Sequence, residues 1–282
     1  MRMRFSHLTL SIASIVIFAA MLGGCSKKEE TATTNTDTSQ AAASKDTSHT
    51  AAAGAATLMT GAAADGQKIF YSTTYGKIKD ACASCHTDGQ PATKDTRLRS
   101  GHTLAGVTSR PSTWNGQFKG DALQKNAYGA TMCAVMYQHK GDDMATVMPK
   151  ADIDAMNAYL DAIKNAPGAM TSELKIEWVT KPKVTDKDKL DEKAANAAAK
   201  AILRLPGDAA SGKDIFSHTC AYCHAMHEKK VGPALDKGFE DPTSGARAIR
   251  VGSDAMPFHA KDILSDQQIA DIIAYIQQEL GK

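Results

Sequence analysis

The sequences "CASCH" at residues 82–86 and "CAYCH" at residues 220–224 share the pattern C-x-x-C-H, the attachment signature of c-type haem. Two cysteines three positions apart on a helical turn point the same way, so both thiols can form thioethers with the vinyl groups of one porphyrin. The histidine that follows then lies under the iron as its proximal ligand. The sequence therefore predicts two covalently bound haem c groups.

The two motifs assign a role to six side chains. We expect thioether bonds from Cys82, Cys85, Cys220 and Cys223, and proximal iron ligation from His86 and His224. The alternatives are a four-cysteine zinc site or redox-active cysteine pairs, but neither needs a histidine directly after the second cysteine. With both motifs, the sequence resembles the c-type cytochromes. That resemblance implies an all-α fold with two tandem class I cytochrome c-like haem domains.

The surroundings of the motifs indicate an internal repeat. The segment "DGQKIFYSTT" at residues 65–74 resembles "SGKDIFSHT" at residues 211–219, and each leads toward its motif. Each copy ends in a predicted helix with an apolar stripe at helical spacing. The stripes are Ile153, Met156, Leu160 and Ile163 in the first copy, and Ile269, Ile272, Ile273, Ile276 and Leu280 in the second. Tyr159 and Tyr275 occupy matching places in the two helices, and both resemble the aromatic residue in the terminal helix of cytochromes c. Ser265 and Gln268 predict a capping box at the start of the second helix.

The N-terminal residues predict export and anchoring. Residues 1–24 combine a positive start with an apolar run, which indicates a signal peptide, although an uncleaved membrane anchor is the alternative. The run ends in "LGGC", which resembles the bacterial lipobox and implies lipidation of Cys25. Residues 25–60 contain almost no large apolar side chains, so we expect a flexible tether. These features predict a lipid-anchored protein on the periplasmic side of a bacterial membrane, and Ser26 favours the outer membrane.

The remaining chain divides into a first haem domain at residues 61–166, a connector at residues 167–205 and a second haem domain at residues 206–282. The connector contains an alanine-rich helix in "DEKAANAAAKAILRL", a short extended piece in "KIEWVTKP", and Trp178 as a candidate interface residue. The first domain carries 12 basic and 10 acidic side chains and the second carries 8 and 11. Neither has the basic stripe that nucleic-acid binding requires.

The second domain has a clear candidate for the distal ligand. Met256 precedes a proline and lies 19 residues before Tyr275, which leaves room for a loop ahead of the last helix. His259 is the alternative. In similar cytochromes the proline carbonyl of "VGPAL" at residues 231–235 orients the proximal histidine, which here is His224.

The first domain leaves its distal ligand open. Met148 also precedes a proline, but it lies only 11 residues before Tyr159, so its loop would struggle to reach across the haem. Met144 and His139 have more room and lack the motif. Cys133 is the sixth cysteine and is left without a partner. It can be an inert buried thiol, an intermolecular disulfide partner or an iron ligand.

A second resemblance bears on Cys133. The segments "LAGVTSRPSTWNGQF", "ALQKNAYGATMCAVM" and "AMNAYL" resemble the dihaem thiosulfate dehydrogenases and the haem subunit of the Sox system, where a helix cysteine ligates the active-site haem. The usual I-N-x-C context is missing, since "GATMC" stands instead. The resemblance implies that Cys133 is the distal ligand, and the catalytic one if the protein is an enzyme.

Two functions remain after this reasoning, because the loop motifs of dihaem peroxidases are missing. The first is an electron carrier between periplasmic or membrane redox proteins. The second is an oxidoreductase of small sulfur oxyanions, whose substrate Arg97, Arg99 and Arg110 could attract, unless they are solvated or pair with haem propionates. Methionine ligation would make the second haem the more oxidising one, and a thiolate would lower the potential of the first.

Overall fold

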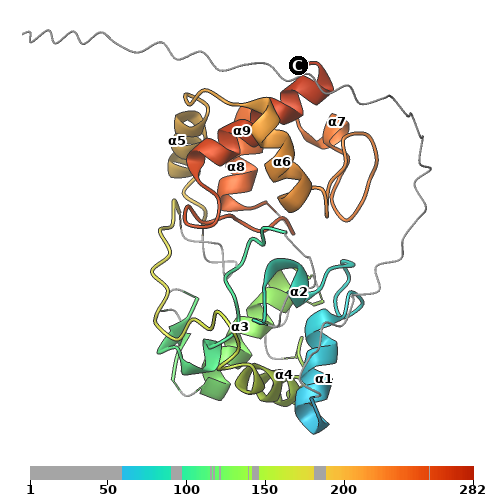
Figure 1. Ribbon diagram of the computed structural model, residues 1–282, viewed down its shortest axis with the longest axis vertical. Coiled ribbons are helices and arrows are strands. Elements are labelled where there is room, and N and C mark those ends of the chain that lie inside the picture. The colour runs from blue at the N-terminus through green and yellow to red at the C-terminus, as the bar shows by residue number, and fades with distance from the viewer. Residues whose placement is uncertain are drawn as a thin grey trace, which may run out of the picture. The chain divides into compact units, whose positions relative to one another are not determined.

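The computed structural model describes residues 59–89, 97–114, 116, 118–120, 122–138, 140–141, 146–180, 189–253 and 255–282 (Figure 1). These residues belong to one compact unit, Thr50–Lys282. The signal peptide, Cys25, His139 and Met144 lie outside the described residues. In the described part of the chain, no helix has the length and apolarity needed to cross a membrane.

The described chain is rich in helices and contains one short hairpin. Its helices are α1 (Gly61–Tyr71), α2 (Cys82–Cys85), the 3₁₀ helix η1 (Val107–Ser109), α3 (Ala122–Met136), α4 (Lys150–Ala162), α5 (Glu192–Ile202), α6 (Ala209–Thr219), α7 (Leu235–Gly238), α8 (Pro242–Val251) and α9 (Asp266–Leu280). Strands β1 (Ser112–Thr113) and β2 (Phe118–Lys119) pair antiparallel. This architecture fits the class I cytochrome c-like fold that the motifs predict.

Helices α1 and α4 cross at a glycine and pack closely (Figure 1). A Cβ atom at Gly66 would lie 2.0 Å from the Ala155 carbonyl oxygen, so only glycine lets the two backbones approach this far. One turn further along each helix, the rings of Phe70 and Tyr159 lie 5.5 Å apart between centroids. The Tyr159 hydroxyl donates a hydrogen bond to Asp88.

Helices α6 and α9 repeat this crossing in the second half of the chain (Figure 1). A Cβ atom at Gly212 would lie 1.9 Å from the Asp271 carbonyl oxygen. The rings of Phe216 and Tyr275 again follow one turn later, with centroids 5.4 Å apart. The repeat in the sequence is therefore matched by a repeated packing contact, and Tyr159 and Tyr275 hold matching places in it.

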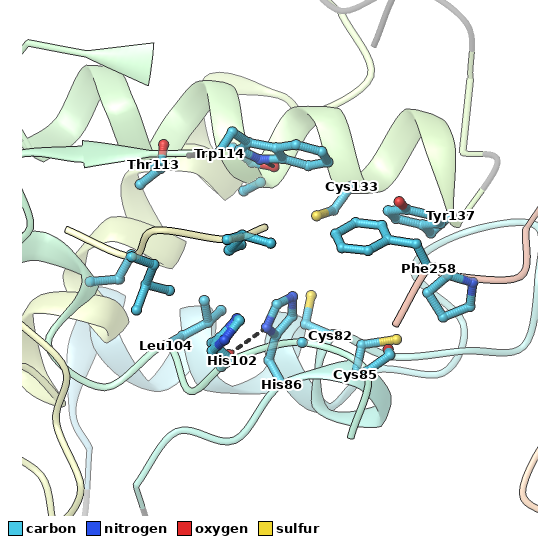
Figure 2. Close-up of a pocket in the computed structure, with 18 of the residues that line it drawn as sticks. Cys82, Cys85, His86, His102, Leu104, Thr113, Trp114, Cys133, Tyr137 and Phe258 are labelled. Atoms are coloured by element: carbon cyan, nitrogen blue, oxygen red, sulfur yellow. Dashed lines mark hydrogen bonds between the residues drawn. The ribbon is translucent and has the colours of Figure 1, made fainter. Parts of the chain in front are cut away.

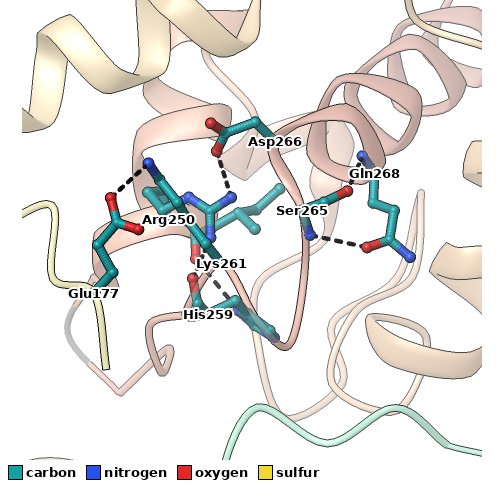
Figure 3. Close-up of polar contacts among 8 residues, drawn as sticks. Glu177, Arg250, His259, Lys261, Ser265, Asp266 and Gln268 are labelled. Atoms are coloured by element: carbon teal, nitrogen blue, oxygen red, sulfur yellow. Dashed lines mark hydrogen bonds and ion pairs between the residues drawn. The ribbon is translucent and has the colours of Figure 1, made fainter. Parts of the chain in front are cut away.

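The predicted start of α9 is confirmed by the hydrogen bonds around it (Figure 3). The Gln268 backbone amide donates to Ser265 Oγ, and the Ser265 amide donates to Gln268 Oε1, so both groups of the capping box are satisfied. Nearby, the buried Arg250 side chain donates to the His259 carbonyl oxygen and to Asp266, each at 2.6 Å. These bonds tie the loop before α9 to helix α8.

The segment between the two halves contains the predicted helix. Helix α5 coincides with the alanine-rich stretch, and Asp191 caps it by accepting a hydrogen bond from the Ala194 amide. The predicted extended piece covers residues 175–182, and no strand forms in its described residues, 175–180. The Trp178 ring instead packs against Phe258, with centroids 4.6 Å apart. This position depends on a distant partner rather than on local strand propensity.

Candidate functional site

The first attachment motif occupies the single helical turn α2. Cys82 and Cys85 are free thiols, and both line an apolar cavity together with His86 (Figure 2). His86 Nδ1 donates a hydrogen bond to the His102 carbonyl oxygen, 2.7 Å away. This bond fixes the ring and leaves the lone pair on Nε2, the atom that a metal ion would bind.

The second motif follows the end of α6 and has the same local arrangement. Cys220 and Cys223 are also free thiols. His224 Nδ1 donates to the Pro233 carbonyl oxygen at 3.0 Å, the contact expected from the sequence "VGPAL". The second histidine therefore has its ring fixed in the same way as the first.

The backbone of a glycine packs directly against each histidine ring. The amides of Gly101 and Gly232 donate to the Cys85 and Cys223 carbonyl oxygens, both at 2.8 Å. A Cβ atom at Gly101 would lie 2.3 Å from His86 Cε1, and one at Gly232 would lie 2.4 Å from His224 Cε1. Both positions therefore need glycine, because any side chain would occupy the space of the imidazole.

Sequence reasoning identified the Pro233 carbonyl as the partner of His224, but it missed the His102 carbonyl and both glycines. His102 stands where the second copy has Pro233, and a longer loop separates it from the motif, so the correspondence is not obvious. The shared signal is G-x-x-L, seen in "GHTL" at residues 101–104 and "GPAL" at residues 232–235. Leu104 and Leu235 donate their amides to equivalent carbonyl oxygens just after each motif.

The wall of the cavity opposite His86 includes Cys133, which projects from α3 (Figure 2). Trp114, Tyr137 and Phe258 line the same wall. The structure thus brings Cys133 into one cavity with the first motif. Met148 is not among the described residues that line this cavity, and it packs instead with Ala134 and Val147 in a separate apolar cluster.

Burial controls the protonation of the thiols around this cavity. It raises the pKa of Cys82 to about 12 and that of Cys85 to about 11. The pKa of Cys133 is raised further, first by burial and then by the charges of the other two thiols. A buried thiolate at Cys133 would therefore need a cation beside it, such as a metal ion.

A covalently attached porphyrin fits this donor set. The cavity is lined mainly by apolar side chains, and it presents the two unpaired thiols of the first motif and a histidine with an available nitrogen. A flat apolar cofactor needs such surroundings, and the thioether bonds and iron ligation need those three groups. In the described part of the chain, no cluster of three or more His, Cys, Asp or Glu side chains could hold a metal ion by itself.

Around the second motif, Met256 and Cys220 pack against the same apolar core cluster. A pair of backbone hydrogen bonds between Ser253 and Met256 closes the loop that carries Met256. The alternative ligand, His259, is buried, and its Nδ1 donates to the Ile249 carbonyl oxygen at 3.3 Å. Burial lowers the pKa of His259 to about 4, so this imidazole is neutral at physiological pH.

The candidate arginines have different surroundings. Arg110 is only 5% exposed and lines the cavity, and it donates to the Thr103 and Met170 carbonyl oxygens, both at 2.7 Å. Its interpretation as an ordinary solvated arginine is therefore wrong. Burial lowers the pKa of Arg110 to about 10, so the side chain keeps its charge. The Arg97 guanidinium lies over the Tyr222 ring.

Comparison with known proteins identifies relatives for part of the chain. The family described as "Cytochrome C oxidase, cbb3-type, subunit III" matches residues 207–276. Cytochrome c6 of Limnospira maxima is 34% identical over 90 residues, which cover 27% of this chain and 98% of the relative. Cytochrome c6 of Bryopsis maxima is 33% identical over 86 residues, with 27% and 97% covered. Cytochrome c6 of Rippkaea orientalis is 32% identical over 80 residues, with 26% and 71% covered. No solved structure matches the chain.

Proposed function

Because the chain belongs to the c-type cytochromes, whose members bind haem c covalently and transfer electrons, we propose that it is a dihaem electron carrier. One haem would be held by Cys82, Cys85 and His86, and the other by Cys220, Cys223 and His224. The observation that carries this proposal is the duplicated support of the two histidines, each held by a backbone carbonyl and by a closely packed glycine.

The haem supplies reversible one-electron chemistry at its iron, and the residues of the chain orient it, bury it and tune it. The carbonyl oxygens of His102 and Pro233 hold His86 and His224 in the tautomer that offers Nε2. In the second half, Met256 is the proposed distal ligand, and it packs, partly buried, against an apolar core cluster. A neutral thioether there would favour the reduced state.

We also propose that the carrier works at a membrane on the periplasmic side. The support is the sequence of residues 1–24 and the lipobox around Cys25, both of which lie outside the described residues. A tether ending near residue 60 would keep the haem domains close to the membrane while leaving them free to meet partners. Those partners are other redox proteins. The outer membrane is the favoured anchoring site for the lipid on Cys25.

A second candidate function is favoured by the position of Cys133 in the cavity opposite His86. If Cys133 ligates the first haem, the protein resembles thiosulfate dehydrogenases, in which such a cysteine serves oxidation of a small sulfur oxyanion. The buried Arg110 places a positive charge at the same cavity. The charge would attract either such an anion or a haem propionate.

Mass spectrometry of the mature protein tests the dihaem proposal directly. We expect the mass of the polypeptide, its lipid and two haem groups, and Cys220→Ser together with Cys223→Ser should remove one haem. A chain that carries one haem or none would contradict the proposal. Electron paramagnetic resonance then separates the two candidate functions. A low-spin thiolate signal that is lost in Cys133→Ala, with ferricyanide reduction by thiosulfate, supports the enzyme, whereas an unchanged spectrum supports the carrier.

A further inference from the structure

The two attachment motifs touch each other through equivalent residues. Ser84 and Tyr222 both occupy the third position of C-x-x-C-H, and Ser84 Oγ donates a hydrogen bond to the Tyr222 hydroxyl at 3.3 Å. The loop after the first motif reinforces this contact. The Leu98 amide donates to the His218 carbonyl oxygen at 2.9 Å, and the Leu98 side chain packs against the core of the second half.

The Tyr222 ring has a second contact, with the side chain of Arg97. The guanidinium carbon of Arg97 lies 4.9 Å from the centroid of the ring, which is the geometry of a cation–π contact. Ser84 is fixed too, because its Oγ accepts a hydrogen bond from the Ala81 amide at 3.2 Å. The hydrogen bond between Ser84 and Tyr222 therefore joins two side chains that each have a second anchor.

Because of this hydrogen bond, the cysteines that directly follow the two residues belong to adjoining segments of the chain. Cys85 directly follows Ser84, and Cys223 directly follows Tyr222. Each of these thiols is a proposed thioether position. The attached edges of the two porphyrins would therefore lie on either side of one hydrogen bond.

We propose that the hydrogen bond between Ser84 and Tyr222 is the bridge through which electrons pass between the two haems, with Tyr222 as its positioning residue. This inference rests on the proposed function, because it needs a haem at each motif. One ferrous iron gives up one electron and one ferric iron accepts it, so no bond forms or breaks and no further reactant is needed.

Physical reasoning favours this route over a path through the cavity. Electron tunnelling weakens steeply with distance, and it is more efficient through covalent and hydrogen bonds than across a gap. From Cys85 the route follows covalent bonds to Ser84 Oγ, crosses one hydrogen bond to Tyr222, and follows covalent bonds to Cys223. The only non-covalent step is the 3.3 Å contact.

The test uses the full-length holoprotein and two conservative variants, Tyr222→Phe and Ser84→Ala. Tyr222→Phe removes the hydroxyl but keeps the ring that stacks on Arg97, so the variant should fold. Pulsed one-electron reduction followed by absorbance would measure the rate of electron exchange between the haems. We expect each variant to slow this rate severalfold, and the double variant to be no slower than the slower single variant. Tyr71→Phe, which removes a hydroxyl outside the bridge, is the matched control and should leave the rate unchanged.

Two further measurements distinguish a bridge from a structural role. The haem content and both reduction potentials should stay unchanged in Tyr222→Phe, whereas a structural role would change them. Two haems per chain with an unchanged exchange rate would overturn the bridge and leave the dihaem proposal standing. A wild-type chain that carries fewer than two haems would overturn both.

Discussion

The glycine at the crossing of α6 and α9 gives a sharp test of the fold, through the substitution Gly212→Ala. The added Cβ would lie 1.9 Å from the Asp271 carbonyl oxygen, 2.4 Å from its carbonyl carbon and 2.9 Å from the Ile272 nitrogen. An ordinary C···O contact is about 3.3–3.6 Å, so the two backbones would have to separate by roughly 1.5 Å. Such a separation would also loosen the contact between Phe216 and Tyr275, one turn away.

The size of the effect follows from two opposing contributions. Overpacking a buried site usually costs about 1–3 kcal/mol, and this site is at or above the upper end because all three neighbouring atoms are backbone. Alanine favours a helix over glycine by about 1 kcal/mol, which offsets part of that cost. We therefore expect a net loss of at least about 2 kcal/mol in the free energy of unfolding. For a domain of 60–100 residues, a loss of about 2 kcal/mol corresponds to a decrease in Tm of roughly 8–16 °C.

Thermal and urea unfolding of the holoprotein, followed by far-ultraviolet circular dichroism, would measure this loss. Lys213→Ala is the matched control, because Lys213 is the next residue in α6 and is exposed. Gly66→Ala should behave like Gly212→Ala, since its Cβ would lie 2.0 Å from the Ala155 carbonyl oxygen. If Gly212→Ala were as stable as the wild type or more stable, the helices could not cross as described, and the argument from the duplicated contact would fail.

Three further predictions concern the second half of the chain. Burial lowers the pKa of His259 to about 4 from 6.5, so its contribution to stability is full above about pH 6.5 and is lost as the pH falls toward 4. His259→Gln should remove up to about 3 kcal/mol of that pH dependence, as measured by urea unfolding at several pH values. If the unfolding free energy of the variant changed with pH as steeply as that of the wild type, the prediction would be contradicted. Asp266→Asn should cost about 3 kcal/mol, because the side chain of Arg250 is 2% exposed and would lose its counterion. Glu192→Gln, at the more exposed pair with Arg247, should cost less than about 1 kcal/mol, and equal costs would show that burial is irrelevant here. Ser265→Ala should cost about 1 kcal/mol through loss of the α9 cap, and an unchanged urea midpoint would contradict the capping box.

Local sequence signals predicted some elements well. The apolar stripe and capping box identified α9, and the alanine-rich segment identified α5, because these signals depend on residues within a few positions of each other. The segment "VGPAL" likewise predicted the Pro233 carbonyl as the partner of His224, nine residues away. In each of these cases, the interaction that stabilises the element is short in sequence.

Other features depend on contacts between distant residues and could not be predicted in this way. Gly66 and Gly212 look like ordinary helix glycines until the opposing carbonyl groups are known. Trp178 lies in a segment with strand propensity, yet its position is set by Phe258, 80 residues further along the chain. The contact between His86 and the His102 carbonyl was missed because the loop before His102 is longer than in the second copy, so aligned spacing failed. Neither Gly101 nor Gly232 was identified from the sequence.

The difference in loop length between the two copies also bears on the distal ligand of the haem proposed for the first motif. Helix α4 begins at Lys150, two residues after Met148, whereas α9 begins at Asp266, ten residues after Met256. With so short a loop, Met148 stays against Ala134 and Val147 beside α4 instead of entering the cavity. Helix α3 instead brings Cys133 to the cavity wall opposite His86. The short loop before α4 would thus replace a neutral methionine ligand, Met148, by an anionic cysteine ligand, Cys133. If this exchange occurs, the reduction potentials of the two haems should differ, with the first haem the lower, and equal potentials would count against Cys133 as a ligand.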